Sequence, residues 1–411
     1  MHILVVNPGS SSIKFAMYAD GWARLRTLYE GELSDIGEPS AALKLRDATG
    51  KDLAGEVGEV KAGSMDEAIG TFQRAIALPG LPSPDAVGYR VVHPGPHLRG
   101  HQRLTPEVLA QLKEATAFAP LHDPEAVQMI ETMMQRASDV PRFACFDTVF
   151  HETMPEEATV YALPEAVRAE GVRRYGFHGL SCESIVMQMR AALGKAFPRR
   201  MVIAHLGSGC SVTACVDGRS VDTTMGLTPT GGVVMGTRPG DLDPGVVFYL
   251  LRRAGATVAS VEAMLNHDAG LKGLGGINDM KELRASAAAG DAQAGVAIRV
   301  FCRSVAKAIA GFMALDGADA IVFAGGIGEH DAASRAEIAQ GIAGLGVEID
   351  GVANRLEHPE PGVGEGRNVR RISEVNSRVG VYVAPAEEDL TIARHVAEMC
   401  GLALPGHGES S

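Results

Sequence analysis

A stretch near the middle of the chain, residues 221–245, combines residue types that bind anions. Its sequence is VDTTMGLTPTGGVVMGTRPGDLDPG, which is too rich in Gly, Thr and Pro to be a single helix. Arg238 lies among the glycines and is followed by Asp241 and Asp243. Glycine lets the backbone approach a ligand closely, and a guanidinium held there can donate forked hydrogen bonds to a phosphate or carboxylate. Taken alone, the stretch is equally consistent with a long surface loop.

A pattern of strand, Gly/Ser turn and strand occurs twice, about half a chain apart. The first copy spans residues 2–18 with the turn NPGSSS, and the second spans 201–216 with the turn GSG. Hydroxyls and backbone N–H groups in such turns form anion-binding nests, although a serine-rich hairpin turn without a ligand is the alternative. No GxxxxGK[ST] motif occurs, so neither turn is a Walker loop. The repetition predicts a duplicated α/β domain with a phosphate-binding hairpin in each half.

Other charged side chains stand where predicted strands end or loops turn. Arg90 lies within an apolar strand pattern, where it would pair with either a structural carboxylate or a ligand anion. Asp147 follows the strand pattern 142–146, and that position faces the ligand crevice in open α/β sheets. His178 stands in the glycine-containing loop RRYGFHG, residues 173–179, with a purely structural histidine as the alternative.

The C-terminal half contains further glycine-rich segments. Residues 320–329 (AIVFAGGIGE) predict a buried strand that leads into a glycine turn at the start of a helix, a suitable place for nucleotide contacts. Residues 270–279 predict a glycine-rich loop, and 290–315 predict a long Ala-rich helix. Acidic residues at 387–389 begin a terminal helix.

Composition limits the class of protein. A chain of 411 residues predicts two domains. The formal net charge of −12 argues against non-specific binding of nucleic acid and against an anionic membrane surface. No apolar run approaches the length of a membrane span, and the start lacks a basic leader. Six cysteines without a CxxC pair predict reduced, packed thiols. We therefore expect a cytoplasmic protein without nucleic-acid or membrane partners.

In their order along nearly the whole chain, these blocks resemble the acetokinase (acetate kinase) family. The matching segments are 7–15 (NPGSSSIKF), 90–93 (RVVH), 119–122 (APLH), 147–155 (DTVFHETMP), 173–179, 205–207 (HLG), the central stretch, 322–329 (VFAGGIGE) and 387–390 (EEDL). The resemblance implies the fold shared by acetate and sugar kinases, the heat-shock chaperone ATPase and actin. That fold has two ribonuclease-H-like α/β domains flanking a nucleotide cleft. The expected domains are residues 1–148 with a returning helix in 387–411, and the nucleotide-binding residues 149–386.

The resemblance also implies a reaction, namely reversible phosphoryl transfer between ATP and acetate to give acetyl phosphate and ADP. It implies Mg²⁺ (with Mn²⁺ as an alternative), direct in-line transfer and a homodimer. A carboxylate is already ionised at neutral pH, so such a reaction needs no general base. It needs groups that align two anions and neutralise the charge on the phosphoryl group in flight.

By resemblance, four residues are catalytic. Arg90 and Arg238 hold the acyl carboxylate and the phosphoryl group, His178 donates to the phosphoryl oxygens, and Asp147 holds the arginine and substrate. The expected acyl pocket is Arg90, Val92, Leu121, Phe177 and Pro229, and the expected metal ligands are Asn7 and Glu388. The expected nucleotide contacts are Ser10, Ser12, Lys14, His205, Gly207, Ser208, Gly209, Asp279, Lys281, Gly325, Gly326, Ile327 and Gly328.

The chain departs from the family pattern at several positions. Where the family commonly has Asn, Arg, Asn, Asn, Gly and His, this chain has Ser208, Lys281, His330, Glu387, Pro94 and Cys182. These differences leave the nucleotide preference open. Propionate or butyrate kinase activity is an alternative, since one methylene is worth only about 1–3 kcal/mol in such a pocket. A non-catalytic actin-like nucleotide switch is another, but it would have no use for the four catalytic residues.

Overall fold

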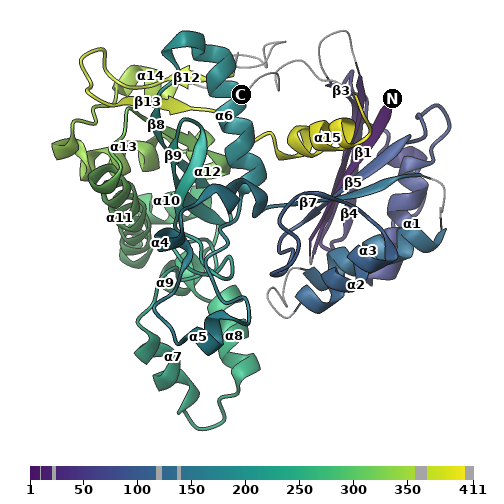
Figure 1. Cartoon of the computed structure of the whole chain (residues 1–411), viewed down its shortest axis with the longest axis horizontal. Helices are drawn as coiled ribbons and strands as arrows, with labels where there is room; N and C mark the ends of the chain where they lie inside the picture. The colour runs from purple at the N-terminus through teal and green to yellow at the C-terminus, as the bar shows by residue number, and fades with distance from the viewer. Residues whose placement is uncertain (10, 21–24, 117–122, 137–139, 357–367, 403–411) are drawn as a thin grey trace. The chain divides into compact units, whose positions relative to one another are not determined.

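We describe the protein from a computed structural model that covers residues 1–9, 11–20, 25–116, 123–136, 140–356 and 368–402 (Figure 1). The chain divides into two compact units. Unit 1 comprises Met1–Val149 and Glu387–Ser411, and unit 2 comprises Phe150–Ala386. Each unit is built around its own β-sheet.

The sheet of unit 1 has the strand order β4-β3-β2-β1-β5-β7-β6. Strands β1 to β4 pair antiparallel in sequence, β1, β5 and β7 pair parallel, and β6 pairs antiparallel with β7. The bounds are β1 (His2–Pro8), β2 (Ile13–Asp20), β3 (Leu25–Ser34), β4 (Ala42–Asp47), β5 (Ala86–Val91), β6 (Gln102–Arg103) and β7 (Arg142–Phe146). The central strand β1 is buried from Ile3 to Val6, as expected for a strand covered on both faces.

Helices cover both faces of this sheet. Helices α1 (Met65–Ile76), α2 (Pro106–Ala115) and α3 (Asp123–Arg136) lie on one face, and α15 (Glu388–Met399) lies on the other (Figure 1). Gly88 of β5 allows α15 to approach, because a Cβ there would lie 2.7 Å from side-chain atoms of Ile392 and Val396. A short 3₁₀ turn, η1 (Ala54–Glu56), completes the unit. Helix α15, the last one among the described residues, therefore packs on the strand that carries Arg90.

The sheet of unit 2 repeats the plan of unit 1. Its order is β10-β9-β8-β11-β13-β12. The first three pair antiparallel, β8, β11 and β13 pair parallel, and β12 is an antiparallel edge strand. The bounds are β8 (Arg200–Leu206), β9 (Cys210–Val216), β10 (Arg219–Thr223), β11 (Ala320–Ala324), β12 (Arg370–Arg371) and β13 (Gly380–Val383). Both sheets share three antiparallel strands followed by two parallel ones, so the predicted α/β fold with two ribonuclease-H-like domains is confirmed.

Unit 2 is rich in helices, most of them short. They are η2 (Val149–Thr153), α4 (Glu156–Thr159), α5 (Glu165–Arg168), α6 (Gly179–Leu193), η3 (Gly194–Ala196), α7 (Pro244–Leu251), α8 (Val258–His267), α9 (Gly270–Gly275), α10 (Met280–Ala288), α11 (Ala292–Leu315), α12 (Gly325–His330), α13 (Ala332–Gly341), η4 (Ala343–Leu345) and α14 (Gly351–Arg355). None of the helices among the described residues is long and apolar enough to span a bilayer.

Two expectations from the sequence need correction. The predicted loop 270–279 begins with the helix α9, which ends at Gly275 and is followed by Gly276 in a left-handed conformation. The glycines that suggested a loop permit close packing instead, since a Cβ on Gly270 would lie 2.2 Å from the carbonyl oxygen of Met235. All six cysteines are free thiols, but Cys400 is exposed, so the prediction of packed thiols is wrong for that residue.

Candidate active site

In unit 1, Arg90 is the centre of a group of oxygen-bearing side chains. Its Nε and Nη2 donate to the two carboxylate oxygens of Asp147 at 2.9 and 2.6 Å, a forked ion pair. Its Nη1 lies 3.3 Å from Oδ1 of Asn7, and its Nε lies 3.7 Å from Oε2 of Glu388. The side chain of Asp147 is only 1% exposed, whereas those of Arg90 and Glu388 are 19% and 17% exposed. Solvent, and hence a ligand, can reach the guanidinium but hardly the aspartate.

The strand order explains why these residues meet. Strands β5 and β7 run parallel with Arg90 beside Cys145, so Asp147 comes just beyond the end of β7. Asn7 lies near the end of the neighbouring strand β1, and Glu388 is the first residue of α15. Burial by itself would lower the pKa of Arg90, but the carboxylates of Asp147 and Glu388 raise it, so the net shift is upward. The guanidinium therefore stays charged.

The remaining residues predicted in unit 1 lie around this group or outside the described part. Lys14 is opposite Asn7 in the β1–β2 pair, and its exposed ammonium lies 3.6 Å from Glu32. The carbonyl of Ser12 accepts from Gly9 N–H at 2.7 Å and closes the turn between those strands. Val92 is half-buried directly after β5. Ser10 and Leu121 lie outside the described residues.

In unit 2, His178 occupies a constrained position at the start of α6. It is the N-cap residue, with a left-handed backbone (φ 59°, ψ 26°) that residues other than glycine adopt uncommonly. Its Nδ1 lies 3.0 Å from Oγ of Ser211, and its ring centroid lies 4.3 Å from that of His205. His205 and Ser211 are paired directly across strands β8 and β9. The imidazole of His178 therefore contacts one residue from each strand of that hairpin. Both histidines are 9% exposed.

The turn 207–209 brings His178 and Arg238 together. A Cβ on Gly209 would lie 3.2 Å from Nε2 of His178 and 3.6 Å from Nη1 of Arg238, so the absence of a side chain allows both to approach the turn. The thiol of Cys210 is close by, and burial raises its pKa to about 12, so it remains neutral. The result is a guanidinium and an imidazole converging on one glycine, an arrangement suited to binding an anion.

The central loop holds Arg238 through its own backbone. Nη1 of Arg238 donates to the carbonyl of Pro229 at 2.9 Å. Asp241 accepts from Gly232 N–H at 2.7 Å and so closes the loop. Asp243 caps α7 through Gly245 N–H at 2.8 Å. These two acidic residues therefore have structural roles. Pro229 and Phe177, both predicted for the acyl pocket, are buried.

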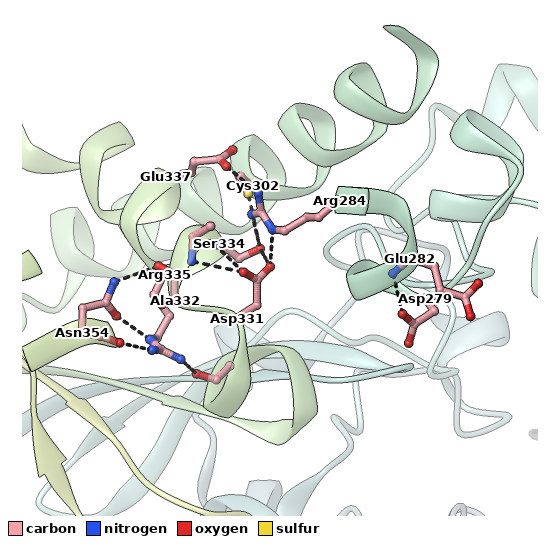
Figure 2. A network of polar contacts seen from close by, with 12 residues as sticks. Asp279, Glu282, Arg284, Cys302, Asp331, Ala332, Ser334, Arg335, Glu337 and Asn354 are labelled. Carbon is pink, nitrogen blue, oxygen red and sulfur yellow. Dashed lines mark hydrogen bonds and ion pairs between the residues drawn. The ribbon is translucent and has the colours of Figure 1, made fainter. Parts of the chain in front are cut away.

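The residues of unit 2 that were predicted to bind nucleotide lie in neighbouring segments. Gly325 has φ +73° and its Cβ would lie 2.7 Å from the carbonyl oxygen of Leu206, so the turn 325–328 passes beside the turn 207–209. Gly236 connects a third segment, because its Cβ would lie 3.4 Å from Ser208 O and 3.2 Å from Asn278 O. Asp279 follows as the N-cap of α10, accepting from Glu282 N–H at 2.9 Å (Figure 2). Asp279 and Lys281 are both exposed.

Sequence reasoning missed two residues that support this site. His151 lies in the matched block 147–155 but received no role. Its Nε2 lies 3.0 Å from the carbonyl oxygen of Phe177, and its Nδ1 lies 2.9 Å from Oγ of Ser220. Glu329 accepts from the backbone N–H groups of Gly325 and Ala386 at 3.0 and 3.1 Å. The matched blocks 147–155 and 322–329 could have drawn attention to His151 and Glu329, respectively.

Of the positions where the chain departs from the family pattern, Cys182 and Pro94 are buried, whereas Ser208, Lys281 and His330 are exposed. The thiol of Cys182 lies 3.8 Å from Oγ1 of Thr213. The exposed differences lie in the segments expected to contact nucleotide.

Comparison with known proteins agrees with the resemblance in the sequence. The model of the acetokinase family matches residues 2–394. The acetate kinase of Deinococcus radiodurans is 42% identical over 409 residues, which cover 98% of each chain. The acetate kinase of Nitrobacter hamburgensis is 40% identical, covering 97% of this chain and 96% of that one.

Two solved structures extend the comparison to the fold. A propionate kinase from Francisella tularensis superimposes with a TM-score of 0.87 at 34% identity, covering 98% of this chain and 100% of that one. The acetate kinase of Porphyromonas gingivalis gives a TM-score of 0.83 at 30% identity, with 97% and 99% covered.

Proposed function

The chain belongs to the acetokinase family, and from that membership we propose that it transfers a phosphoryl group reversibly between ATP and acetate. The products are acetyl phosphate and ADP, and the transfer is direct and in line. The observation that carries the proposal is the convergence of Arg238 and His178 on Gly209, a residue whose missing side chain leaves room beside both. A cation and a hydrogen-bond donor fixed at one point are what a phosphoryl group in flight requires.

The roles follow from the chemistry of each side chain. Arg238 neutralises charge on the transferring phosphoryl group, and His178 donates a hydrogen bond to its oxygens through Nε2. Arg90 binds the acyl carboxylate. Asp147 holds the Arg90 guanidinium in its plane through the forked ion pair, at 2.6 and 2.9 Å, and is too buried to serve as a base for substrate. Acetate needs no base, since it is ionised at neutral pH.

The oxygen donors of unit 1 fit a hard divalent cation. Asn7 offers an amide oxygen and Glu388 a carboxylate, and both lie beside a single arginine that also faces the carboxylate of Asp147. Carboxylate and amide oxygens are the ligands that Mg²⁺ prefers, and Mn²⁺ accepts the same set. When bound with the nucleotide, the ion neutralises phosphate charge. Asn7 and Glu388 would hold it, with water in the remaining positions.

For ATP, we propose contacts from the turns 207–209 and 325–328, from Ser10, Ser12 and Lys14, and from Asp279 and Lys281. The half-buried Val92, the buried Phe177 and Pro229, and Leu121 would set the length of the acyl chain. Propionate is the alternative substrate that a specific finding favours, namely the likeness to the propionate kinase of Francisella tularensis. Cytoplasmic location, and the identification of units 1 and 2 with the two domains of the family, belong to the same proposal.

A homodimer is supported by an exposed apolar surface on unit 2. On and beside α7, Leu242, Val246, Phe248 and Tyr249 are 39%, 40%, 55% and 67% exposed, and Val258 of the neighbouring helix α8 is 72% exposed. Grouped large apolar side chains of this kind mark interaction surfaces, and a second copy of the chain would cover them. Sedimentation of Phe248→Glu should then show monomers. Val375→Glu, at a separate exposed valine, is the control and should stay dimeric.

The activity is tested by incubating the purified protein with ATP, Mg²⁺ and hydroxylamine. The hydroxamates formed from acetate, propionate and butyrate are then compared. Acetate as the best substrate supports the proposal as stated, and a preference for propionate or butyrate keeps the mechanism but changes the substrate. A folded chain that binds ATP but forms no hydroxamate would contradict the proposal and favour a nucleotide switch.

A further inference from the structure

Two of the segments proposed to contact nucleotide are joined by a polar network that the proposed reaction does not use. One segment is the start of α10, with Asp279 and Lys281, and the other is residues 325–328, the first turn of α12. Figure 2 shows that Arg284 extends from α10 toward Asp331, the residue directly after α12. The network therefore connects two segments that are far apart in the sequence.

Arg284 uses all three of its nitrogen atoms in this connection. Its Nε donates to Oδ2 of Asp331 at 2.6 Å, Nη2 donates to Oγ of Ser334 at 2.9 Å, and Nη1 donates to Oε1 of Glu337 at 3.0 Å. The side chains of Arg284 and Asp331 are 24% and 16% exposed. A guanidinium with three acceptors at fixed positions is held in one orientation, unlike a typical surface lysine.

Asp331 connects Arg284 to the glycine turn through further hydrogen bonds. Its Oδ2 also accepts from Oγ of Ser334 at 2.6 Å, and its Oδ1 accepts from the N–H groups of Ala333 and Ser334 at 3.1 and 3.3 Å. Its own N–H donates to the carbonyl of Ile327 at 2.9 Å. The aspartate is thus fixed both to the start of α13 and to the backbone of the glycine turn.

The turn itself is held rigidly at both ends. Arg335 is 2% exposed, and its Nη1 donates to the carbonyls of Gly328 and Glu329 at 2.8 and 2.9 Å. Asn354 accepts from Nε of Arg335 at 2.7 Å. At the other end, the carboxylate of Glu329 accepts from Gly325 N–H. Because α12 is braced in this way, a contact made at Asp331 fixes the position of the whole turn.

We propose that the Arg284–Asp331 pair is a latch that sets the spacing between the start of α10 and the glycine turn, and thereby the affinity for the nucleotide. Arg284 and Asp331 are positioning residues, since they act through the backbone that contacts the ligand. The inference rests on the nucleotide-binding role proposed above for Asp279, Lys281 and 325–328. The latch holds the two segments at the spacing of the nucleotide-bound state before the nucleotide binds. The free-energy cost of ordering them on binding is therefore smaller.

The test measures ADP binding to the full-length protein by calorimetry, together with the kinetic constants for acetate. The variants are Arg284→Met, which keeps the apolar stem, Arg284→Lys, which keeps the charge but cannot fork, and Asp331→Asn. The control is Arg200→Met. Arg200 forms a forked pair with Asp319 in the same unit, with a shortest distance of 2.6 Å, but at an exposed position at the start of β8.

We expect Arg284→Met and Asp331→Asn to raise the Kd for ADP on the order of tenfold, a typical size for coupling through a side-chain network. Arg284→Lys should give a smaller rise. The KM for acetate, and kcat at saturating ATP, should change little. The Kd of the double variant for ADP should be no higher than that of the single variant with the higher Kd, because either change alone already breaks the Arg284–Asp331 ion pair.

Unchanged ADP affinity in both single variants, while the wild-type chain binds ADP, would overturn the inference and leave the proposed function intact. An equal loss in Arg200→Met would also overturn it, since the effect would then reflect general stability. A wild-type chain that does not bind ADP would overturn the proposed function and the inference with it.

Discussion

The Nε2 atom of His151 lies 3.0 Å from the carbonyl oxygen of Phe177, the residue directly before His178. A carbonyl can only accept, so Nε2 carries the proton, and Nδ1 then faces the hydroxyl of Ser220 at 2.9 Å as an acceptor. Burial lowers the pKa of His151 to about 4, which keeps the ring in this neutral form. The ring also packs against Gly176, whose Cβ would lie 2.7 Å from it. A neutral histidine thus fixes the backbone that presents the strained His178.

We predict that His151→Asn lowers kcat by about 10²-fold, the size of effect expected when a catalytic group is misplaced by about 1 Å. The asparagine amide can replace Nδ1 but does not reach the carbonyl of Phe177. The matched variant is His151→Gln, whose longer amide reaches the position of Nε2. Steady-state kinetics should show most of kcat retained in the glutamine variant, with KM for ATP unchanged in both. Equal losses in the two variants would rule out the hydrogen bond as the cause.

The same histidine should make the fold sensitive to acid. The unfolded chain binds this proton below the ordinary pKa of 6.5, whereas the folded chain binds it only below about 4. Stability from His151 is therefore complete above pH 6.5 and is lost as the pH falls toward 4, at up to ~1.4 kcal/mol per pH unit. Urea unfolding between pH 7 and 4.5 should show a steeper loss for the wild type than for His151→Gln. Parallel curves for the two proteins would contradict this assignment.

Arg238→Ala should reduce kcat by about 10³-fold or more, as found for other arginines that neutralise a phosphoryl group in flight. The midpoint of thermal unfolding should change little, because Arg238 is a half-buried side chain of the central loop and not part of a hydrophobic core. Arg252→Ala, at an exposed arginine just after α7, provides the control and should retain full activity. Near-normal turnover in Arg238→Ala would remove this arginine from the site.

Local patterns in the sequence were enough to predict the fold class. The two Gly/Ser hairpins mark β1–β2 and β8–β9, and the apolar runs before Asp147 and Gly325 are the buried parallel strands β7 and β11. The strand order could not be predicted from these patterns, because a run of apolar residues does not specify its neighbours in the sheet. Arg90 shows the same limit. Its apolar context required a partner without identifying it. The family resemblance suggested Asp147, and the parallel pairing of β5 and β7 shows why that residue lies beside it.

The supporting residues of the site could not be predicted in the same way. Arg284 and Asp331 are 47 residues apart in sequence and meet only because α10 and α13 pack on the same long helix, α11. Arg335 is buried with carbonyl oxygens and an asparagine as its partners, and polar spacing in the sequence gives no sign of this. The helix α9 replaced a predicted loop, with Gly270 packed against the central loop and Gly275 against α10 and α11. In each case tertiary contacts outweigh the local preference.

The last prediction concerns Gly209, where the absence of a side chain allows His178 and Arg238 to meet. Its backbone does not require glycine, since its φ lies outside the left-handed region. An added methyl would lie 3.2 Å from Nε2 of His178 and must displace the ring by a few tenths of an ångström. We therefore expect Gly209→Ala to lower kcat about tenfold with little change in thermal stability. Gly311→Ala, where a Cβ meets nothing within 4 Å, is the control and should leave kcat unchanged. If Gly209→Ala keeps full activity, the close approach of the two side chains to this turn does not govern catalysis.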